Sequence, residues 1–291
     1  MTPELVRELL SDQCPDLADL ELQPFAHGWD NEMFRLGDTL LARFPRREAT
    51  AVLLEHEARW LPTLANHLTT WTPRPIFVGR PTSAFPWTWT IAPFLAARAA
   101  AAVPVPERTP AAEDLADFFG SLHLAAPLGA PVNPVRGMAL DQPAIHARVL
   151  ERLAREGGRS GALAERWHAW SRAPEWEGPD VWLHGDAHAL NVLLTDTGRL
   201  AGVVDWGDIT SGDPACDLAA GWLIFDEEGR RRFVARCSLN PAYDEHVWAR
   251  ARAWALQLGL ILAQQADDQP LLRATGELAL ANVLAETPEA R

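Results

Sequence analysis

The chain has 291 residues, of which 48% are hydrophobic, so it can bury the core of one large domain or two smaller ones. Its net charge of −13 argues against a nucleic-acid partner, because binding of phosphate backbones requires a basic patch. The three cysteines are widely separated, which indicates neither a disulfide framework nor a zinc ribbon and is typical of a reducing cytoplasm.

The first third of the chain combines helical and extended patterns. Residues 1–12 favour a helix with Thr2 as its N-cap and Pro3 at its first position, and they contain no apolar signal region. The elements expected after this helix are hairpins over residues 20–44, a helix over 49–64 and strands over 76–78 and 87–91. We therefore predict an N-terminal lobe of sheet and helix over residues 1–95.

The rest of the chain, residues 96–291, is predicted to form a mainly helical C-terminal lobe. It begins with an Ala- and Pro-rich stretch, 96–112, that we expect to be a connecting loop. Helices are expected over residues 113–124, 143–155, 161–170 and 213–225, with two or three more between 241 and 286. The longest uncharged apolar stretch near the end of the chain, 254–263, is too short to cross a bilayer, so we expect a cytoplasmic protein without a membrane anchor.

A dense group of polar residues lies among three short apolar runs. The group is His184-Gly185-Asp186-Ala187-His188-Ala189-Leu190-Asn191, and Asp205 follows the third run. The runs 181–183, 192–194 and 200–204 predict strands, the last two joined by a Gly-containing turn. Such a hairpin would bring Asn191 and Asp205, at its open ends, close together.

These side chains suit phosphoryl transfer. Asp186 can orient an attacking hydroxyl group and accept its proton, while Asn191 and Asp205 can supply hard oxygen ligands to Mg²⁺. One alternative is a zinc site of His184, Asp186 and His188, but zinc needs a further convergent ligand, and no other His or Cys pair has supporting spacing. Another is that the polar residues only cap helices and satisfy turns, which their joint spacing disfavours.

The pattern H-G-D-x-x-x-x-N with a downstream Asp resembles the aminoglycoside phosphotransferase and choline kinase family, a small-molecule branch of the protein-kinase-like fold. The resemblance covers nearly the whole chain and is strongest at 184–221. It implies an α+β fold with an N-terminal antiparallel sheet lobe for the nucleotide and a helical C-terminal lobe with the catalytic loop and the acceptor site. It also implies Mg²⁺-dependent transfer of the γ-phosphoryl group of ATP or GTP to a hydroxyl group of a small molecule, such as an aminoglycoside-like or macrolide-like antibiotic.

In the N-terminal lobe the resemblance assigns residues to the nucleotide. Gly28 lies in the loop that would cover the phosphates, where the absence of a Cβ permits close approach. Arg43 stands where relatives place a lysine, and the planar guanidinium suits phosphate. Glu57 would pair with this cation. The segment from Ala92 to Leu95, which includes Phe94, matches the hinge whose backbone would pair with the adenine edge.

Supporting roles are expected around the catalytic loop. His184 should anchor the loop through a side-chain hydrogen bond, and His188 either approaches substrate or phosphate or is an exposed loop histidine. Asp213 and Asp217 should be structural, and Asp213 precedes a proline as a helix N-cap does. Asp208 is either a partner of the site or an exposed loop carboxylate.

Two questions about function stay open at this point: the charge of the acceptor, and whether the chain is an enzyme or a binding module. Acidic groups at 226–228, 244–245 and 267–268 either face a cationic acceptor or are solvated helix ends. A protein kinase is disfavoured, since no Asp-Phe-Gly segment follows the catalytic loop. The alternative of a different class is a nucleotide-binding pseudokinase, a binding module in which Arg43 does not support turnover.

Overall fold

The computed structural model describes residues 1–27, 31–265 and 269–287, and the chain divides into two compact units. Unit 1 comprises residues 1–96 and 204–209, and unit 2 comprises residues 97–203 and 210–291. The chain therefore returns to unit 1 for a short segment before it completes unit 2. The predicted lobes, residues 1–95 and 96–291, assign residues 204–209 to the C-terminal lobe and so do not include this return to unit 1.

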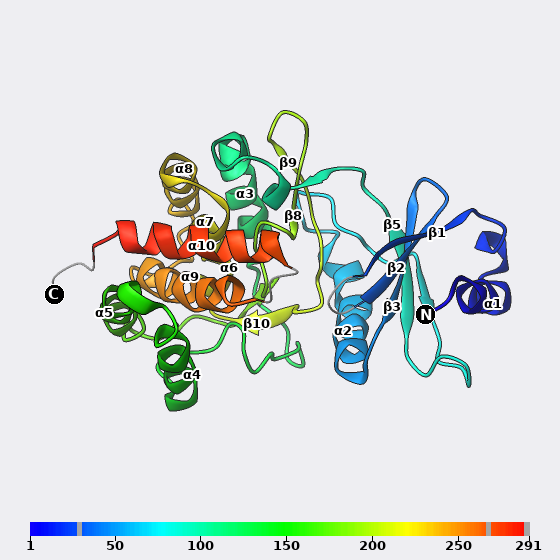
Figure 1. Ribbon diagram of the computed structural model, residues 1–291, viewed down its shortest axis with the longest axis horizontal. Coiled ribbons are helices and arrows are strands. Elements are labelled where there is room, and N and C mark those ends of the chain that lie inside the picture. Colours follow the sequence, from blue (N-terminus) through cyan, green and yellow to red (C-terminus); the bar gives the residue numbers. More distant parts are fainter. Residues whose placement is uncertain (28–30, 266–268, 288–291) are drawn as a thin grey trace. The chain divides into compact units, whose positions relative to one another are not determined.

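Unit 1 is built on a five-stranded sheet with the strand order β1-β2-β3-β5-β4 (Figure 1). All neighbouring strands are antiparallel, as the sequence predicts, and Met33 pairs with Arg43 between β2 and β3. The strands are β1 (Leu22–His27), β2 (Asn31–Leu36), β3 (Leu40–Pro45), β4 (Phe77–Gly79) and β5 (Trp89–Pro93).

The two helices of unit 1 confirm the helical patterns. α1 (Pro3–Gln13) begins after Thr2, whose hydroxyl oxygen accepts the N–H of Leu5 at 3.3 Å. α2 (Glu48–Leu64) begins one residue before its predicted start, and a short 3₁₀ helix (Pro15–Leu17) follows α1.

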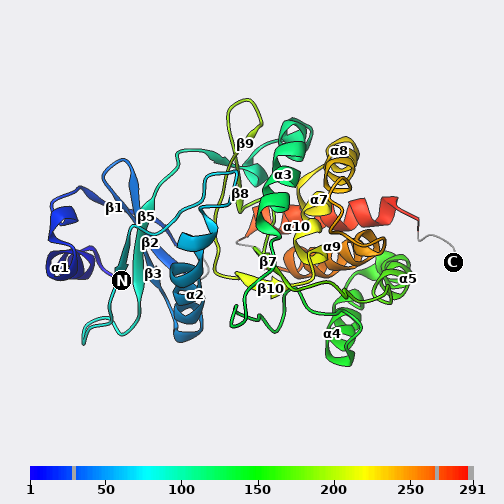
Figure 2. The ribbon, with the colours of Figure 1, turned by 180° about the vertical axis from the view of Figure 1, so that it is seen from behind.

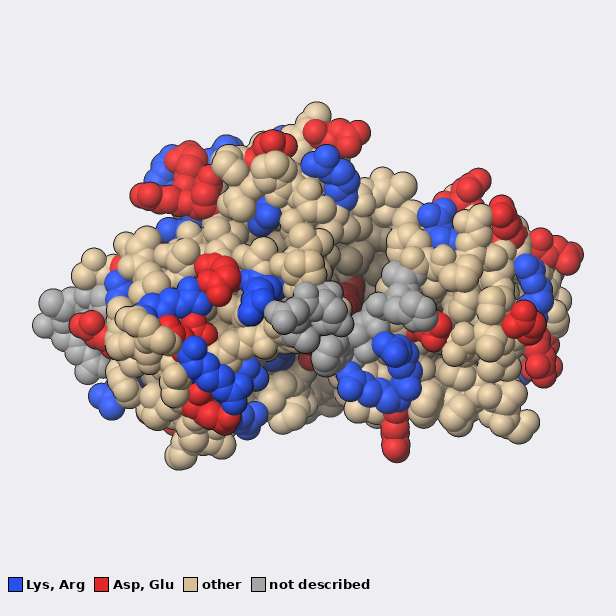
Figure 3. Space-filling model, viewed as in Figure 1, with Lys and Arg blue, Asp and Glu red and all other residues tan. Residues whose placement is uncertain are grey.

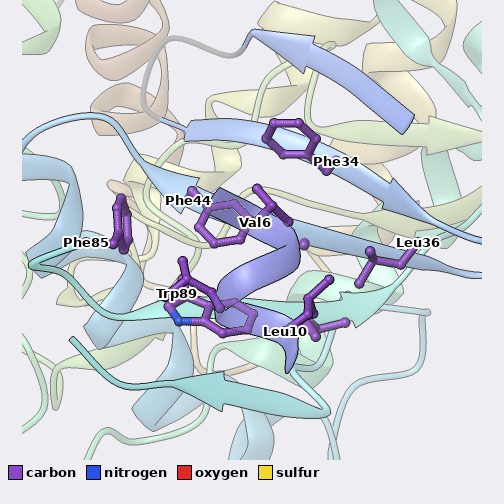
Figure 4. Close-up of a cluster of buried hydrophobic side chains, with 10 residues drawn as sticks. Val6, Leu10, Phe34, Leu36, Phe44, Phe85 and Trp89 are labelled. Carbon is purple, nitrogen blue, oxygen red and sulfur yellow. The ribbon is translucent and has the colours of Figure 1, made fainter. Parts of the chain in front are cut away.

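A cluster of buried hydrophobic side chains holds α1 against the sheet (Figure 4). Val6 and Leu10 of α1 are fully buried, and Phe44 of β3 stacks on Trp89 of β5 with 5.2 Å between ring centroids. Because successive side chains of a strand point to opposite faces, Phe44 in this core places Arg43 on the other face of β3. Arg43 thus meets α2, where its ion-pair partner lies.

Unit 2 is mainly helical (Figure 2). Its longest helices, α9 and α10, lie side by side, and Gly276 permits their close approach, because a Cβ there would lie 2.2 Å from the backbone nitrogen of Ala263. None of the described helices is both long and apolar enough to cross a membrane. The helices are α3 (Ala112–Leu122), α4 (Pro143–Leu153), α5 (Ser160–Trp170), α6 (Ala215–Leu218), α7 (Ala220–Ile224), α8 (Glu227–Cys237), α9 (Val247–Ala263) and α10 (Pro270–Ala285).

Two small sheets in unit 2 carry the polar motif. β8 and β9 form the predicted hairpin, in which Val192 pairs with Val203, and β6 adds a third strand beside β8. β7 pairs with β10 in a second sheet. The strands are β6 (Arg98–Ala99), β7 (Val181–Leu183), β8 (Val192–Leu194), β9 (Leu200–Val203) and β10 (Thr210–Gly212).

Three predictions for unit 2 were wrong in detail. The stretch 96–112 is not a plain loop, since it contains β6 and two 3₁₀ helices (Ala100–Ala102 and Val105–Ala111). The helix expected over 213–225 is divided at Ala219 into α6 and α7. Neither α8 nor β10 was predicted. A further 3₁₀ helix (Gly157–Arg159) precedes α5.

Candidate active site

The loop between β7 and β8 is fixed by a buried carboxylate. Asp217 of α6 is fully buried and accepts the N–H groups of His184 at 2.7 Å and Gly185 at 2.8 Å. The same carboxylate lies 3.2 Å from Nε2 of His123, whose Nδ1 lies 2.7 Å from the hydroxyl oxygen of Tyr243. These hydrogen bonds satisfy the carboxylate oxygens, which would be costly to bury without partners. Asp217 therefore braces the loop, and His123 and Tyr243 extend that support.

Asp186, the predicted base, follows this fixed point. Its carboxylate is held between two basic side chains: Oδ1 lies 3.2 Å from Nη2 of Arg136, and Oδ2 lies 3.3 Å from Nε2 of His188. Nδ1 of His188 accepts the N–H of Leu190, so the neutral imidazole carries its proton on Nε2 and donates it to Asp186. His188 is buried, not an exposed loop histidine.

The surroundings of Asp186 determine its protonation. Burial by itself would raise the pKa of this carboxyl group, but His188, Arg136 and His184 outweigh burial and hold the pKa well below its usual range. Asp186 is consequently a carboxylate at neutral pH, and 23% of its side chain is exposed to receive a hydroxyl group.

Arg136 is a site residue that the sequence analysis missed. The loop that carries it is tied to β10 and the residue after it: Ser211 donates its N–H to the carbonyl of Pro131 at 3.0 Å, and Asp213 donates to the carbonyl of Gly137 at 2.9 Å. Gly137 has φ +67°, which a residue without Cβ adopts readily. Arg136 is 50 residues from Asp186 in the chain, so no local pattern indicates their contact.

The two histidines do not converge as zinc ligands. Nδ1 of His184 accepts the N–H of Asp186 at 3.3 Å, and this contact anchors the loop. Both ring nitrogens of His188 are used within the loop, as described above. Among the described residues, no group of three His, Cys, Asp or Glu side chains is arranged to hold a metal ion.

Asn191 closes the loop. Its Nδ2 donates to the backbone carbonyl of Asp186 at 3.0 Å, and the side chain is buried. The hydrogen bond ties the amide to the residue expected to act as base, and it leaves Oδ1 as the group that can face a cation. Magnesium prefers such oxygen ligands and usually takes only one or two from the protein, together with phosphate oxygens and water.

In unit 1 the structure brings Arg43, Glu57 and Asp205 together. Arg43 is ion-paired with Glu57 of α2, which is fully buried, and its Nη2 lies 3.7 Å from Oδ1 of Asp205. Asp205 has φ +62°, a conformation that Asp and Asn tolerate better than other non-glycine residues. Its side chain is 53% exposed, so the carboxylate can take another ligand. Trp206 beside it is fully buried, and Asp208 is half-buried.

In the hinge segment, backbone pairing with β3 shows which way the polar groups of Ala92 and Phe94 point. Ala92 pairs with Leu41 of β3, and Phe94 donates its N–H to the carbonyl of Thr39 at 2.7 Å. Backbone groups of alternate residues point to opposite sides of a strand, as the carbonyl of Ile91 shows by accepting from Ile76 on the β4 side. The backbone groups of Ala92 and Phe94 are therefore directed toward β3.

Other residues singled out in the sequence have structural contacts. Asp213 accepts the N–H of Ala215 and pairs with Arg250 at 2.6 Å. Asp226 caps α8 by accepting from Gly229, and Asp244 also pairs with Arg250. These acidic groups thus belong to helix ends. Gly28 and the pair 267–268 lie outside the described residues.

Comparisons with known proteins agree with this geometry. The model of the family described as "Phosphotransferase enzyme family" matches residues 21–254. The viomycin phosphotransferase of Streptomyces vinaceus is 34% identical over 93 residues, which are 31% of this chain and 32% of that protein. The chain spans less than a third of the length of the curated relatives it matches.

Two solved structures have a similar fold. The GDP and kanamycin complex of APH(2'')-IIIa aligns with a TM-score of 0.68 and 18% identity, over 96% of this chain and 98% of that one. Macrolide 2'-phosphotransferase type I aligns with a TM-score of 0.64 and 23% identity, over 95% and 97% of the two chains. The kinase-like two-lobed fold expected from the sequence is thereby confirmed.

Proposed function

The chain belongs to the phosphotransferase enzyme family, and from this premise we propose that it transfers the γ-phosphoryl group of ATP or GTP to a hydroxyl group of a small molecule. The observation that carries the proposal is the state of Asp186, a carboxylate held ionised by His188 and Arg136 and partly open to solvent. Such a group can orient the acceptor hydroxyl and accept its proton as the phosphoryl group is transferred.

Four of the described residues would serve the nucleotide and its metal ion. Arg43 would contact the phosphates, with Glu57 holding the guanidinium in place. Asn191 and Asp205 would hold Mg²⁺, because they offer oxygen ligands of the type this ion prefers. Bound Mg²⁺ would neutralise charge on the phosphates. Gly28 would allow the covering loop to approach the phosphates.

Within the expected segment 92–95, the backbone pattern favours two particular groups for the base. Since Ala92 and Phe94 face β3, alternation along the strand would direct the carbonyl of Pro93 and, if it continues past β5, the N–H of Leu95 to the opposite side. A carbonyl and an N–H two residues apart can meet the donor and acceptor on the edge of an adenine or guanine. We therefore assign base recognition to Pro93 and Leu95.

The acceptor is tested by turnover. The first compounds to use with ATP or GTP and Mg²⁺ are kanamycin, which is bound in one of the similar structures, and a macrolide and viomycin, for which two similar proteins are named. Neutral and anionic hydroxyl compounds follow. Formation of nucleoside diphosphate and phosphorylated acceptor in equal amounts is the expected result. Nucleotide binding without turnover on any acceptor would instead favour the pseudokinase, and absence of nucleotide binding would contradict both functions.

The metal is tested without an acceptor. Calorimetry should show that Mg²⁺ tightens nucleotide binding, and Asp205→Ala should abolish this effect. Asp38→Ala, which removes an exposed carboxylate from the turn between β2 and β3, is the matched control and should retain it. Equal tightening in both variants would remove Asp205 from the metal site.

A further inference from the structure

We infer that a small pocket in unit 2 binds an anionic group of the acceptor, so that the acceptor is a hydroxylated carboxylate or phosphate; this inference rests on the proposed function. The pocket has a volume of about 200 Å³ and is lined by residues of α4 and α9 and of the loop after α3. Arg148 and Arg152 line it from α4, and because they are four residues apart they share one face of that helix. Arg136 lines it from the loop.

The charge of this pocket is unusual for the chain. No carboxylate is among its lining residues, although the net charge of the chain is −13. Arg148 donates to the carbonyl of Ala144, and Arg152 donates to the amide oxygen of Gln264, and both acceptors are neutral. Within the described parts of the chain neither arginine pairs with a carboxylate. Their positive charge is therefore available to a ligand.

Other arginines of unit 2 contrast with these two. On the face drawn in Figure 3, basic side chains lie beside acidic ones. Arg231 pairs with Glu228 at 2.7 Å, and Arg236 pairs with Asp117 at 2.6 Å. Arg155, just beyond α4, pairs with Glu151 at 2.5 Å. Arg108 and Arg166 also donate only to backbone carbonyls, so the distinctive feature of the pocket is that two arginines without a carboxylate partner among the described residues line one cavity.

A second observation also indicates a ligand. Oε1 of Gln257, on the α9 side of the pocket, is buried and accepts no hydrogen bond from any described residue. A buried acceptor without a donor is unfavourable, and a ligand that carries a hydroxyl group beside its anionic group would satisfy it. The remaining lining is aliphatic and includes Ile145, Val149 and Ile261, which suits a short apolar segment between the polar groups.

Arg136 connects this pocket with the reaction. It lines the pocket, and its Nη2 lies 3.2 Å from Oδ1 of Asp186. In the proposed binding mode the anion lies against Arg148 and Arg152, and the hydroxyl group of the same molecule lies at Asp186. An ammonium group would be repelled at the same position, so the pocket discriminates against polycationic acceptors.

The experiment compares three probes that share a six-carbon chain and a terminal hydroxyl: 6-hydroxyhexanoate, its amide 6-hydroxyhexanamide, and 6-hydroxyhexyl phosphate. Binding to the full chain is measured by calorimetry without nucleotide, and phosphoryl transfer is measured separately with ATP or GTP and Mg²⁺. The proteins are the wild type, the double variant Arg148→Gln/Arg152→Gln, and the control Arg155→Gln.

We expect the wild type and the control to bind the better of the two anions at least about tenfold more tightly than the amide, because a charge-assisted contact is lost in the amide. The double variant should lose this preference. Whichever of the two anions binds more tightly shows whether the pocket prefers a carboxylate or a phosphate. Equal binding of all three probes by the wild type, or an unchanged preference in the double variant, would overturn the inference. Selective anion binding that leads to no transfer from either nucleotide, on these probes or on the acceptor panel, would support the anion pocket and contradict the proposed function.

Discussion

In the proposed reaction the carboxylate of Asp186 accepts the proton of the acceptor hydroxyl group. Asp186→Asn keeps the size of the side chain and removes its ability to accept a proton, so kcat should fall by about 10²–10⁴-fold while nucleotide affinity changes little. Asp196→Asn, which changes an exposed carboxylate in the β8–β9 turn, is the control and should retain full turnover. Comparable kcat in the two variants would show that Asp186 is not the base.

The pH dependence of turnover tests the partners of Asp186. Because its pKa is depressed in the folded protein, the carboxylate stays ionised as the pH falls through the range in which ordinary carboxyl groups protonate. Arg136→Gln removes one of the groups that lower this pKa, so the pKa should rise and the acid limb of the kcat profile should move to higher pH. Arg155→Gln is the control, and coincident acid limbs for the two variants would contradict the role of Arg136.

At the scale of elements, glycine determines how closely α9 and α10 pack. In Gly276→Ala the new Cβ would lie 2.2 Å from a backbone nitrogen that cannot rotate away, so the helices must separate. We expect a loss of about 1–3 kcal/mol in the free energy of unfolding, measured in urea. Gly120→Ala on the exposed side of α3, where no atom lies within 4 Å of the new Cβ, should instead stabilise by about 0.5–1 kcal/mol.

The same elements show what the sequence could reveal. Strands and long helices of unit 1 followed from periodicity, because each buries one face against a single core. α8 was missed because its apolar positions are few, with only Gly229, Phe233 and Cys237 on its narrow buried face beside Arg230. β10 was missed because three small residues have little strand pattern, and its pairing with β7 depends on tertiary contacts.

The residues of the candidate site also divide into those that a local sequence pattern predicts and those that only tertiary structure reveals. Asp186, Asn191 and Asp205 lie within a short stretch, so the prediction of phosphoryl transfer could be made from their spacing. Arg136 is brought to Asp186 by tertiary structure, and the direction of the backbone at residues 92–95 depends on the register with β3. Neither the contact of Arg136 nor the direction of these backbone groups follows from a local sequence pattern. Both change which residues we propose to contact a ligand.

At the scale of the whole molecule, the absence of lysine offers a direct test of Arg43. Acyl phosphates of ATP transfer an acyl group to a nearby lysine amine, and the chain offers no lysine side chain, since all 26 basic residues are arginine. Arg43→Lys should therefore become acylated at residue 43 in a reaction that free ATP suppresses, and mass spectrometry of peptides would locate the label.

The matched control is Arg98→Lys, an exposed position in β6. It should acquire no label that ATP suppresses. If the two variants were labelled equally, or if residue 43 were not labelled although the variant still bound nucleotide, the phosphate-binding role would pass to another arginine, such as Arg35 or Arg46.

The return of the chain to unit 1 at residues 204–209 affects recombination between related genes. Unit 1 is encoded by two separate stretches, and a single crossover that replaces residues 1–96 brings in a new Arg43 but keeps the resident Asp205. These two side chains lie 3.7 Å apart and would then come from different parents. Exchange of unit 1 as a whole between related genes consequently takes two linked recombination events, one for residues 1–96 and one for residues 204–209.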